Sequence, residues 1–338
     1  MSGYRVAQAA VAGGPLEVAE REVPRPGPGH VRIAVDACGI CGSDAAFVNA
    51  FLPGLRFPVV PGHEIAGRIT ELGEGTPGVW RVGDRVAVGW FGGCCNKCIP
   101  CRKGFFINCE NGQVPSWHYP GGYAQSVVVP ANALARIPDE LSFVEAAPMG
   151  CAGVTTYHAL REMNTVPGDR VGVLGIGGLG HLGVQFARAM GFETIAIARG
   201  AAKAQDARQL GAHHYVDSTA GDVSKALHAL GGVSAILATA GNSEAMAQTV
   251  GGLSPRGELV VVGVTTEPLP ISPMQLISPA LRVIGHPSGT ARDIEDTMHF
   301  AVLSGVRARI EERPLSEAAD AYAAMEQGRA RYRMVLTM

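Results

Sequence analysis

The chain has 338 residues, of which 47% are apolar and 17% charged, and its formal net charge is −2. This length predicts two domains, and so small a charge excludes nucleic acid and anionic membranes as expected partners. The sequence has neither an apolar run long enough to cross a bilayer nor a secretory signal, so we expect a cytoplasmic protein. In that reducing compartment, we expect its cysteines to serve as metal thiolates.

The expected elements change in character along the chain. Up to about residue 150, short β segments such as 31–35 and 84–88 are separated by glycine and proline. From about residue 165, strands alternate with helices, which indicates a parallel sheet. The expected strands here are 170–176, 194–198, 233–239 and 258–264, and the expected helices are 179–190 and 201–210. A helix at 293–303 and a closing strand near residue 335 complete an α/β protein.

Three separate residues of the first half form a possible catalytic metal set. Cys41 opens the segment Cys-Gly-Ser-Asp, His63 lies in Pro-Gly-His-Glu, and Cys151 follows Pro-Met-Gly just before a helical stretch. A catalytic zinc takes three protein ligands and leaves a fourth position for water or substrate. Taken singly, each residue is more often a packed core side chain. Their flanking motifs favour a zinc site of two cysteines and one histidine.

A second set of cysteines is closely spaced. Cys95, Cys98 and Cys101 are separated by two residues each, and Cys109 follows. Four such thiolates fit a tetrahedral zinc knuckle with no open position, so its role is structural. The alternative is a cluster of disulfides or idle thiols, which the intracellular character of the chain disfavours.

A glycine-rich segment lies between the strand at 170–176 and the following helix. It reads Gly175-Ile176-Gly177-Gly178-Leu179-Gly180, and this context predicts dinucleotide binding. Gly175 permits the tight turn, Gly177 lets backbone amides approach a pyrophosphate, and Gly180 lets the helix pack closely. The helix amino terminus then favours the anion.

These motifs together resemble the zinc-dependent medium-chain alcohol dehydrogenases, in that family's order and over essentially the whole chain. The resemblance implies a GroES-like, β-rich catalytic domain at 1–155, a doubly wound Rossmann domain at 156–290, and a return of 291–338 to the first domain. It also implies roles for further residues. Ser43 passes the alcohol proton, Asp44 orients His63, Glu64 approaches the zinc during exchange, Thr155 faces the nicotinamide, and Arg333 approaches the cofactor phosphates.

The residues after the second Rossmann strand indicate which cofactor is used. A carboxylate at the end of that strand commonly binds the ribose of NAD, but Ala198 occupies the position here. Arg199 can bind a 2′-phosphate through its planar guanidinium, and Lys203 adds a second positive charge. We therefore expect NADP(H). The alternative is that both cations are ordinary surface charges.

The resemblance implies hydride transfer between NADP(H) and an alcohol or aldehyde, with two zinc ions per chain, one of them a Lewis acid at the reacting oxygen. The aromatic residues Trp90, Phe91 and the segment 117–119 favour a flat or apolar primary substrate. Two alternatives are an NAD-dependent dehydrogenase of polyols or secondary alcohols, and a non-catalytic NADP-binding scaffold. Relatives form homodimers or homotetramers. In one departure, Ala46 stands where many relatives carry a proton-relaying histidine.

Overall fold

The structure is a computed structural model that describes residues 3–338, and its contacts divide the chain into two compact units. The first unit holds the chain up to Val154 together with Gly289–Met338, and the second unit holds Thr155–Ser288. The units are defined by packing alone, so the division into functional domains at 1–155, 156–290 and 291–338 stays a prediction. Among the described residues, no helix is both long and apolar enough to cross a membrane.

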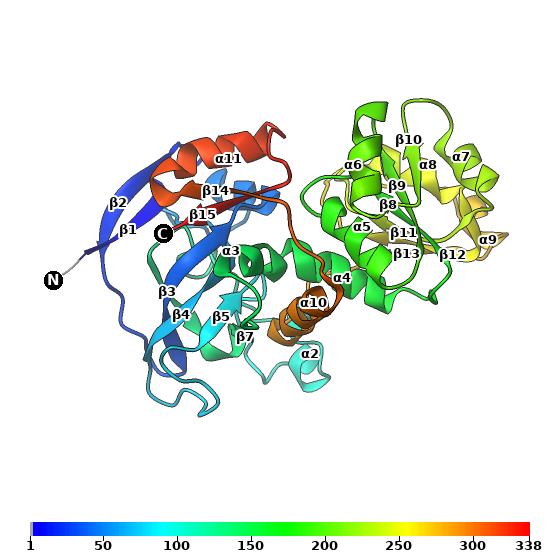
Figure 1. The fold of residues 1–338 in the computed structure, drawn as a ribbon. Coiled ribbons are helices and arrows are strands. Elements are labelled where there is room, and N and C mark those ends of the chain that lie inside the picture. Colours follow the sequence, from blue (N-terminus) through cyan, green and yellow to red (C-terminus); the bar gives the residue numbers. More distant parts are fainter. Residues whose placement is uncertain (1–2) are drawn as a thin grey trace. The chain divides into compact units, whose positions relative to one another are not determined.

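The first unit is built on antiparallel β structure. Its main sheet has the strand order β14-β15-β3-β4-β5-β7, with β6 also paired to β3, and a separate ribbon pairs β1 with β2. Chain order and space differ, because the last strand, β15, lies beside β3 (Figure 1). The strands are β1 (Gly3–Ala9), β2 (Leu16–Glu22), β3 (His30–Gly39), β4 (Glu64–Leu72), β5 (Arg85–Val88), β6 (Ser126–Pro130), β7 (Ala135–Arg136), β14 (Ile310–Pro314) and β15 (Arg333–Thr337).

Alternation along β3 shows why this sheet forms. Val31, Ile33 and Val35 are buried and alternate with partly exposed residues, as expected for a strand with one face on the core. The register pairs the last residue of β3, Gly39, with the first of β4, Glu64. The ends of these two strands therefore lie together, and this is where the candidate site is built.

Short helices connect and cover the first unit. They are α1 (Ala45–Val48), α2 (Ile99–Arg102), α3 (Phe143–Ala146), α10 (Ala291–Ser304) and α11 (Ala318–Glu326), while α4 (Ala152–Glu162) runs from the first unit into the second. The predicted helix at 293–303 begins earlier than expected, because Thr290 caps α10. Its hydroxyl accepts from the Asp293 backbone N–H, and the Asp293 carboxylate accepts from Thr290 N at 2.9 Å.

The second unit is a six-stranded, wholly parallel sheet of order β10-β9-β8-β11-β12-β13. Helices α5 and α6 lie on one side of it, and α7 and α8 on the other (Figure 1). The strands are β8 (Arg170–Leu174), β9 (Glu193–Ala198), β10 (His214–Asp217), β11 (Val233–Ala238), β12 (Leu253–Val261) and β13 (Arg282–Gly285). The helices are α5 (Gly180–Ala189), α6 (Ala204–Gln209), α7 (Val223–Ala229), α8 (Ser243–Val250) and α9 (Pro273–Ile277). The predicted α/β class and the Rossmann sheet are confirmed.

Two predicted strands end early. The strand predicted at 170–176 stops at Leu174 because Gly175 turns the chain with φ +91. The strand predicted at 258–264 is the end of β12, which stops at Val261 where the N–H groups of Val262 and Gly263 both donate to Ala238 O. The sequence analysis omitted β10, β13, α7 and α8, which are short and carry weak periodic patterns.

Candidate active site and metal centres

Three chain segments of the first unit meet at a buried cluster. Cys41 follows β3, His63 precedes β4, and Cys151 lies between a 3-10 turn and α4. Their side-chain donor atoms and a carboxylate oxygen of Glu64 all lie within 4.8 Å of one another. The Sγ atoms of Cys41 and Cys151 are 3.9 Å apart. A tetrahedral zinc with bonds of about 2.3 Å separates its sulfur ligands by about 3.8 Å, so the two thiols have the spacing that this ion needs.

Asp44 holds this cluster in place. Its carboxylate is fully buried, and Oδ1 lies 2.8 Å from His63 Nδ1, which is the contact that the sequence analysis predicts. Oδ2 accepts from the Cys41 backbone N–H at 2.9 Å and from the Tyr123 hydroxyl at 2.8 Å. Because Nδ1 donates to Asp44, the lone pair of His63 lies on Nε2, as in many metal-binding histidines.

The free donor atoms fit a zinc ion. His63 Nε2 is buried and has no hydrogen-bond partner among the described residues. The hydrogen bond between the two thiols lowers the pKa of Cys41 and raises that of Cys151. An orphaned imidazole nitrogen beside two thiols is costly unless a cation binds all three. Cys41, His63 and Cys151 therefore suit zinc with one position open.

Glu64 is engaged by a residue from the far end of the chain. Nη2 of Arg333, in β15, donates to both of its carboxylate oxygens, at 2.5 Å to Oε2. Burial raises the pKa of Glu64 to about 7 although Arg333 acts in the opposite direction. The Arg333 side chain is buried, and its Nε has no hydrogen-bond partner. In this structure the Arg333 guanidinium is bound to Glu64. Its approach to the cofactor phosphates therefore stays a prediction.

Aromatic rings border the cluster. The ring of Trp90 lies 5.2 Å from that of His63, edge to face, and 5.7 Å from the stacked ring of Phe47. Phe47, in α1, is a neighbour that the sequence analysis did not single out. Phe91 is buried, and Trp117 and Tyr119 bond instead to the carbonyls of Pro53 and Gly92. Trp90 and Phe47 thus form the apolar wall nearest to the candidate metal ligands.

The four-cysteine segment forms a second cluster. The donor atoms of Cys95, Cys98, Cys101 and Cys109 lie within 4.8 Å of one another. The backbone N–H groups of Lys97 and Cys98 lower the pKa of Cys95 to about 6, and Asn111 donates from its side chain to the same sulfur. Such N–H donors stabilise thiolates, the form that binds metal. Cys94 is not part of the cluster; its Sγ donates to Asn96.

The predicted glycine segment lines a cavity of about 1050 Å³ in the second unit. The cavity lies at the carboxyl ends of β8, β9 and β11, where the strand order reverses, and this is the usual dinucleotide position in such sheets. Gly175, Gly177, Gly178 and Leu179 line it. Gly180 lies beneath, where a Cβ would overlap the Gly175 carbonyl oxygen. Thr155 does not line this cavity; its hydroxyl donates to Ser288 Oγ at 3.1 Å.

The cavity rim carries the residues predicted to choose the cofactor. Ala198, Arg199 and Lys203 all line it; Arg199 is exposed, and Lys203 Nζ donates to Ile176 O at 3.1 Å. A carboxylate that the sequence analysis missed, Asp217, lies beside Ala198 in the sheet register. Its Oδ1 accepts from Gly200 N and from both the N–H and hydroxyl of Thr219. Asp217 Oδ1 is thus bonded to the loop that follows β9 and to Thr219 of its own loop.

Comparisons with known proteins identify the family of this chain. Residues 27–139 match the alcohol dehydrogenase GroES-like domain, and residues 178–302 match the zinc-binding dehydrogenase family. The chain is 40% identical to alcohol dehydrogenase patD of Penicillium expansum over 100% of this chain and 98% of the relative. The chain belongs to the zinc-binding alcohol dehydrogenase family.

Two further relatives place the dehydrogenase within its family. It is 33% identical to aldehyde reductase AdhA of Synechocystis sp. over 96% of each chain. The structure of cinnamyl alcohol dehydrogenase SbCAD4 from Sorghum bicolor superposes with a TM-score of 0.90 at 30% identity, covering 99% of this chain and 98% of that one. The predicted family and the GroES-like domain are therefore confirmed, and the protein is an alcohol dehydrogenase.

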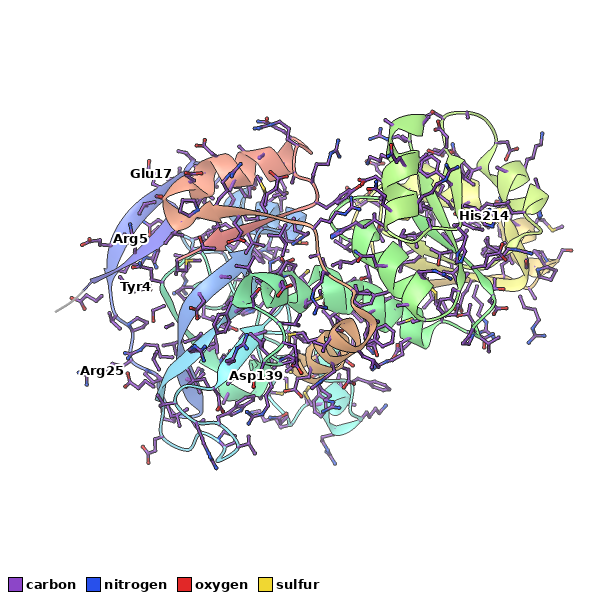
Figure 2. The ribbon with its side chains drawn as sticks, in the orientation of Figure 1. Tyr4, Arg5, Glu17, Arg25, Asp139 and His214 are labelled. Atoms are coloured by element: carbon purple, nitrogen blue, oxygen red, sulfur yellow. The ribbon has the colours of Figure 1, made fainter. Side chains whose placement is uncertain are left out.

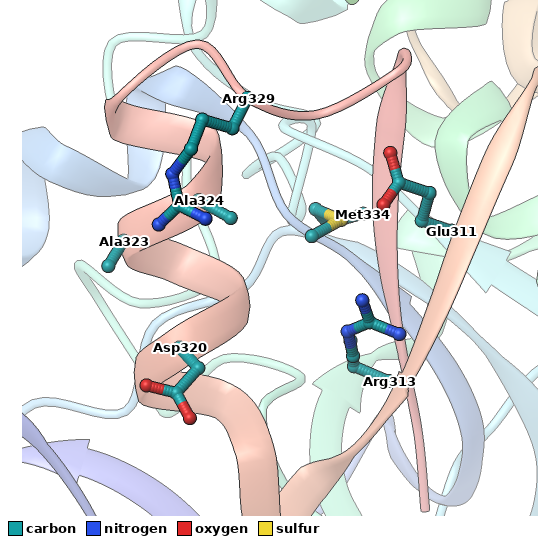
Figure 3. A pocket seen from close by; sticks show the side chains of 7 residues that line it. All are labelled: Glu311, Arg313, Asp320, Ala323, Ala324, Arg329 and Met334. Carbon is teal, nitrogen blue, oxygen red and sulfur yellow. The ribbon is translucent and has the colours of Figure 1, made fainter.

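The dehydrogenase also has a smaller pocket away from both clusters. It has a volume of about 260 Å³ and is lined by residues of β14, β15 and α11 (Figure 3). Glu311 and Arg313 line it from the side of β14, and Asp320 and Arg329 from the side of α11, so the lining charges balance. We assign no function to this pocket.

Proposed function

We propose that this dehydrogenase is an NADP(H)-dependent alcohol dehydrogenase or aldehyde reductase with two zinc ions per chain, acting on primary aromatic or aliphatic substrates. The cofactor assignment depends on one observation: two cations, Arg199 and Lys203, and the small Ala198 border the candidate dinucleotide cavity. A carboxylate at position 198 would repel a 2′-phosphate, whereas the Arg199 guanidinium can bind it through paired hydrogen bonds. The glycine segment and the amino terminus of α5 would bind the pyrophosphate.

In the proposed mechanism, Cys41, His63 and Cys151 bind the catalytic zinc. Zinc bound there supplies a Lewis acid that favours alkoxide over alcohol and polarises a carbonyl group. Asp44 fixes the His63 ring through Nδ1, so that Nε2 remains a ligand atom. Trp90 and Phe47 exclude water from the same side. A nicotinamide bound in this dehydrogenase would supply or accept the hydride, and we assign to Thr155 a place facing it.

The proton must travel separately from the hydride. We assign its first transfer to the Ser43 hydroxyl, because Ser43 lies two residues after Cys41 and is half-buried in the turn Gly42–Asp44. Ala46 has no titratable group, so a proton accepted by Ser43 would leave by the ribose of a bound cofactor and water, or by another base. Glu64, whose carboxylate belongs to the buried cluster, is assigned to the exchange of the zinc-bound water.

The aromatic wall supports a flat, apolar substrate. Aromatic rings that pack in offset or edge-to-face pairs add about 0.5–1.5 kcal/mol beyond area burial. The names of two relatives, a cinnamyl alcohol dehydrogenase and an aldehyde reductase, agree with this choice and with reduction as a working direction.

The test is kcat/KM for NADPH and NADH with cinnamaldehyde, in the wild type and in Arg199→Ala. We expect the wild type to prefer NADPH, and the variant to lose about 10- to 100-fold of kcat/KM for NADPH with little change for NADH, because one charge-assisted contact contributes about 1.5–3 kcal/mol. Arg208→Ala is the matched control, since Arg208 is an exposed cation of the neighbouring α6 that does not line the cavity. Preference of the wild type for NADH would refute the cofactor assignment.

The alternatives predict different results. An NAD-dependent dehydrogenase of polyols or secondary alcohols would prefer NADH and would turn over sorbitol or 2-butanol faster than cinnamyl alcohol. A non-catalytic scaffold would be inactive with every pair and would retain about one zinc per chain in place of two. Metal analysis of the purified chain separates the last case without any choice of substrate.

A further inference from the structure

A third group of metal-binding side chains lies in the second unit, apart from the two cysteine clusters. His158 and Glu162 are four residues apart on α4, and His286 follows β13 directly. Donor atoms of these three side chains lie within 4.8 Å of one another. Residues spaced by four on a helix share one face, so α4 presents an imidazole and a carboxylate together to His286.

The Glu162 carboxylate bridges the two imidazoles. Oε1 lies 3.0 Å from His158 Nε2, and Oε2 lies 3.1 Å from His286 Nε2. A tetrahedral ion with bonds of about 2.0–2.1 Å separates its nitrogen and oxygen ligands by about 3.3 Å. Each distance therefore needs to open by only a few tenths of an ångström, which a glutamate side chain provides by a small rotation.

The partner of the outer nitrogen of His158 agrees with a cation at this place. His158 Nδ1 lies 3.3 Å from the Ser288 carbonyl oxygen. Both nitrogens of this ring therefore lie beside oxygen atoms, and an ion bound at Nε2 would leave Nδ1 as the donor to the carbonyl. A backbone carbonyl at Nδ1 is also the usual outer partner of a metal-binding histidine.

The group is buried on the side of its two histidines and open to solvent on the side of Glu162. The side chains of His158 and His286 are only 15% and 8% exposed, whereas that of Glu162 is 55% exposed. His286 Nδ1 is buried and has no hydrogen-bond partner in the described structure. The two imidazoles thus lie on the buried side of the group. Solvent can supply the remaining ligand from the exposed side, where Glu162 lies.

We propose that His158, Glu162 and His286 form a third metal site, which binds a divalent transition ion such as Zn²⁺, Co²⁺ or Ni²⁺. Two imidazoles and one carboxylate are a ligand set that suits these ions and not Mg²⁺ or Ca²⁺, which prefer oxygen. The chain enters the second unit at Thr155, on α4, and leaves it at Ser288. An ion here therefore joins the entering segment to the leaving segment.

The experiment starts from the full chain with zinc already bound at the two cysteine clusters. Further zinc is titrated in by isothermal calorimetry, and bound metal is measured after equilibrium dialysis. Glu162→Gln is the main variant, because an exposed side chain can be changed without disturbing the core. His286→Gln is the second. His214→Gln is the matched control, because His214 pairs with Glu193 at 2.7 Å elsewhere in the second unit and belongs to no three-ligand group (Figure 2).

We expect the wild type and His214→Gln to bind one more ion per chain than Glu162→Gln and His286→Gln, or to bind it at least about tenfold more tightly. Co²⁺ added in place of zinc must bind with no thiolate-to-cobalt charge-transfer absorption, which separates this site from the cysteine clusters. Equal binding by the wild type and Glu162→Gln would overturn the proposal and leave the group as an ion pair only. A thiolate band on the additional Co²⁺ would also overturn it.

Discussion

At the scale of single residues, the site depends on a side chain that binds no metal. Asp44 joins Cys41, His63 and Tyr123 through one buried carboxylate. A buried charge with three donors is stabilised by them, and it fixes the histidine tautomer in return. Tyr123 is 79 residues from Asp44 in sequence, and no motif marks it.

We predict that Asp44→Asn weakens zinc binding at the Cys41–His63–Cys151 cluster by about 10- to 100-fold, because the amide no longer forces the His63 proton onto Nδ1. The measurement is retained zinc after dialysis against a series of chelator concentrations. Tyr123→Phe removes one neutral donor to Asp44 and leaves the tautomer unchanged, so it should lose much less zinc. Equal zinc retention by Asp44→Asn and the wild type would contradict the role given to Asp44.

For substrate binding, we predict that Trp90→Ala raises KM for cinnamaldehyde by about 2- to 10-fold, the equivalent of one aromatic contact of about 0.5–1.5 kcal/mol. Acetaldehyde serves as the control substrate, since it has no ring to pack and its KM should change little. A similar rise for both aldehydes would show that Trp90 supports the site as a whole and does not select aromatic substrates.

At the scale of elements, the four-cysteine segment and the helix caps are short structures stabilised by local polar contacts. Helix α2 has only four residues, too few to be stable by propensity alone. The N–H groups directed at Cys95 and Cys109 show that the backbone already surrounds the thiols. These contacts stabilise the segment, and we propose that a metal bound by the four thiolates stabilises it further.

We predict that Cys98→Ser removes one zinc per chain and lowers the thermal unfolding midpoint, since ligand loss uncouples metal binding from folding of the segment. Cys94→Ser is a close control, because Cys94 is adjacent to the cluster while its Sγ donates to Asn96. The readouts are zinc content and calorimetric unfolding. Loss of zinc from both variants would refute the assignment of the four ligands.

The cap of α10 can be tested separately. Thr290→Ala removes the hydroxyl that accepts from the Asp293 N–H, and we expect a loss of about 1 kcal/mol and a midpoint lower by roughly 2–4 °C. Ser304→Ala, at the other end of the same helix, removes a hydroxyl that donates to the Phe300 carbonyl. Its midpoint should change by less than that of Thr290→Ala; equal shifts would contradict the capping argument.

At the scale of the whole molecule, one strand of the second unit has an exposed edge. β13 pairs only with β12 among the described strands, and all four of its residues are exposed. Val283 and Ile284 lie on it, each more than a third exposed. An unpaired edge with apolar side chains is a template for pairing with another chain. We propose that a second copy of this chain covers it, which agrees with the homodimer or homotetramer expected from the family resemblance.

Accordingly, Val283→Lys should shift the mass in solution toward the monomer, because a charge on the edge opposes strand pairing. Val166→Lys is the control, as Val166 is exposed in the turn before β8 and not on the edge strand. Light scattering during size-exclusion chromatography gives the mass of each variant. A monomeric wild type would refute the proposed oligomer.

The residue types that bind metals and phosphates, and their local spacing, were readable from the sequence. The four-cysteine segment, the segments around Cys41, His63 and Cys151, and the glycine turn before α5 each have a fixed local pattern because their chemistry requires it. These patterns determined the family and the α/β class. They also placed the long, strongly periodic elements, since periodicity is a local property.

Only the tertiary structure decided which distant residues meet. It paired Glu64 with Arg333, brought Tyr123 to Asp44 and Trp90 to His63, and bonded Asp217 to the backbone of Gly200. It also placed His286 against His158 and Glu162. These contacts join distant segments of the chain, many of them loops at strand ends, so they depend on strand order and register. A sequence read by local pattern carries no direct sign of either, because both follow from packing of the complete chain.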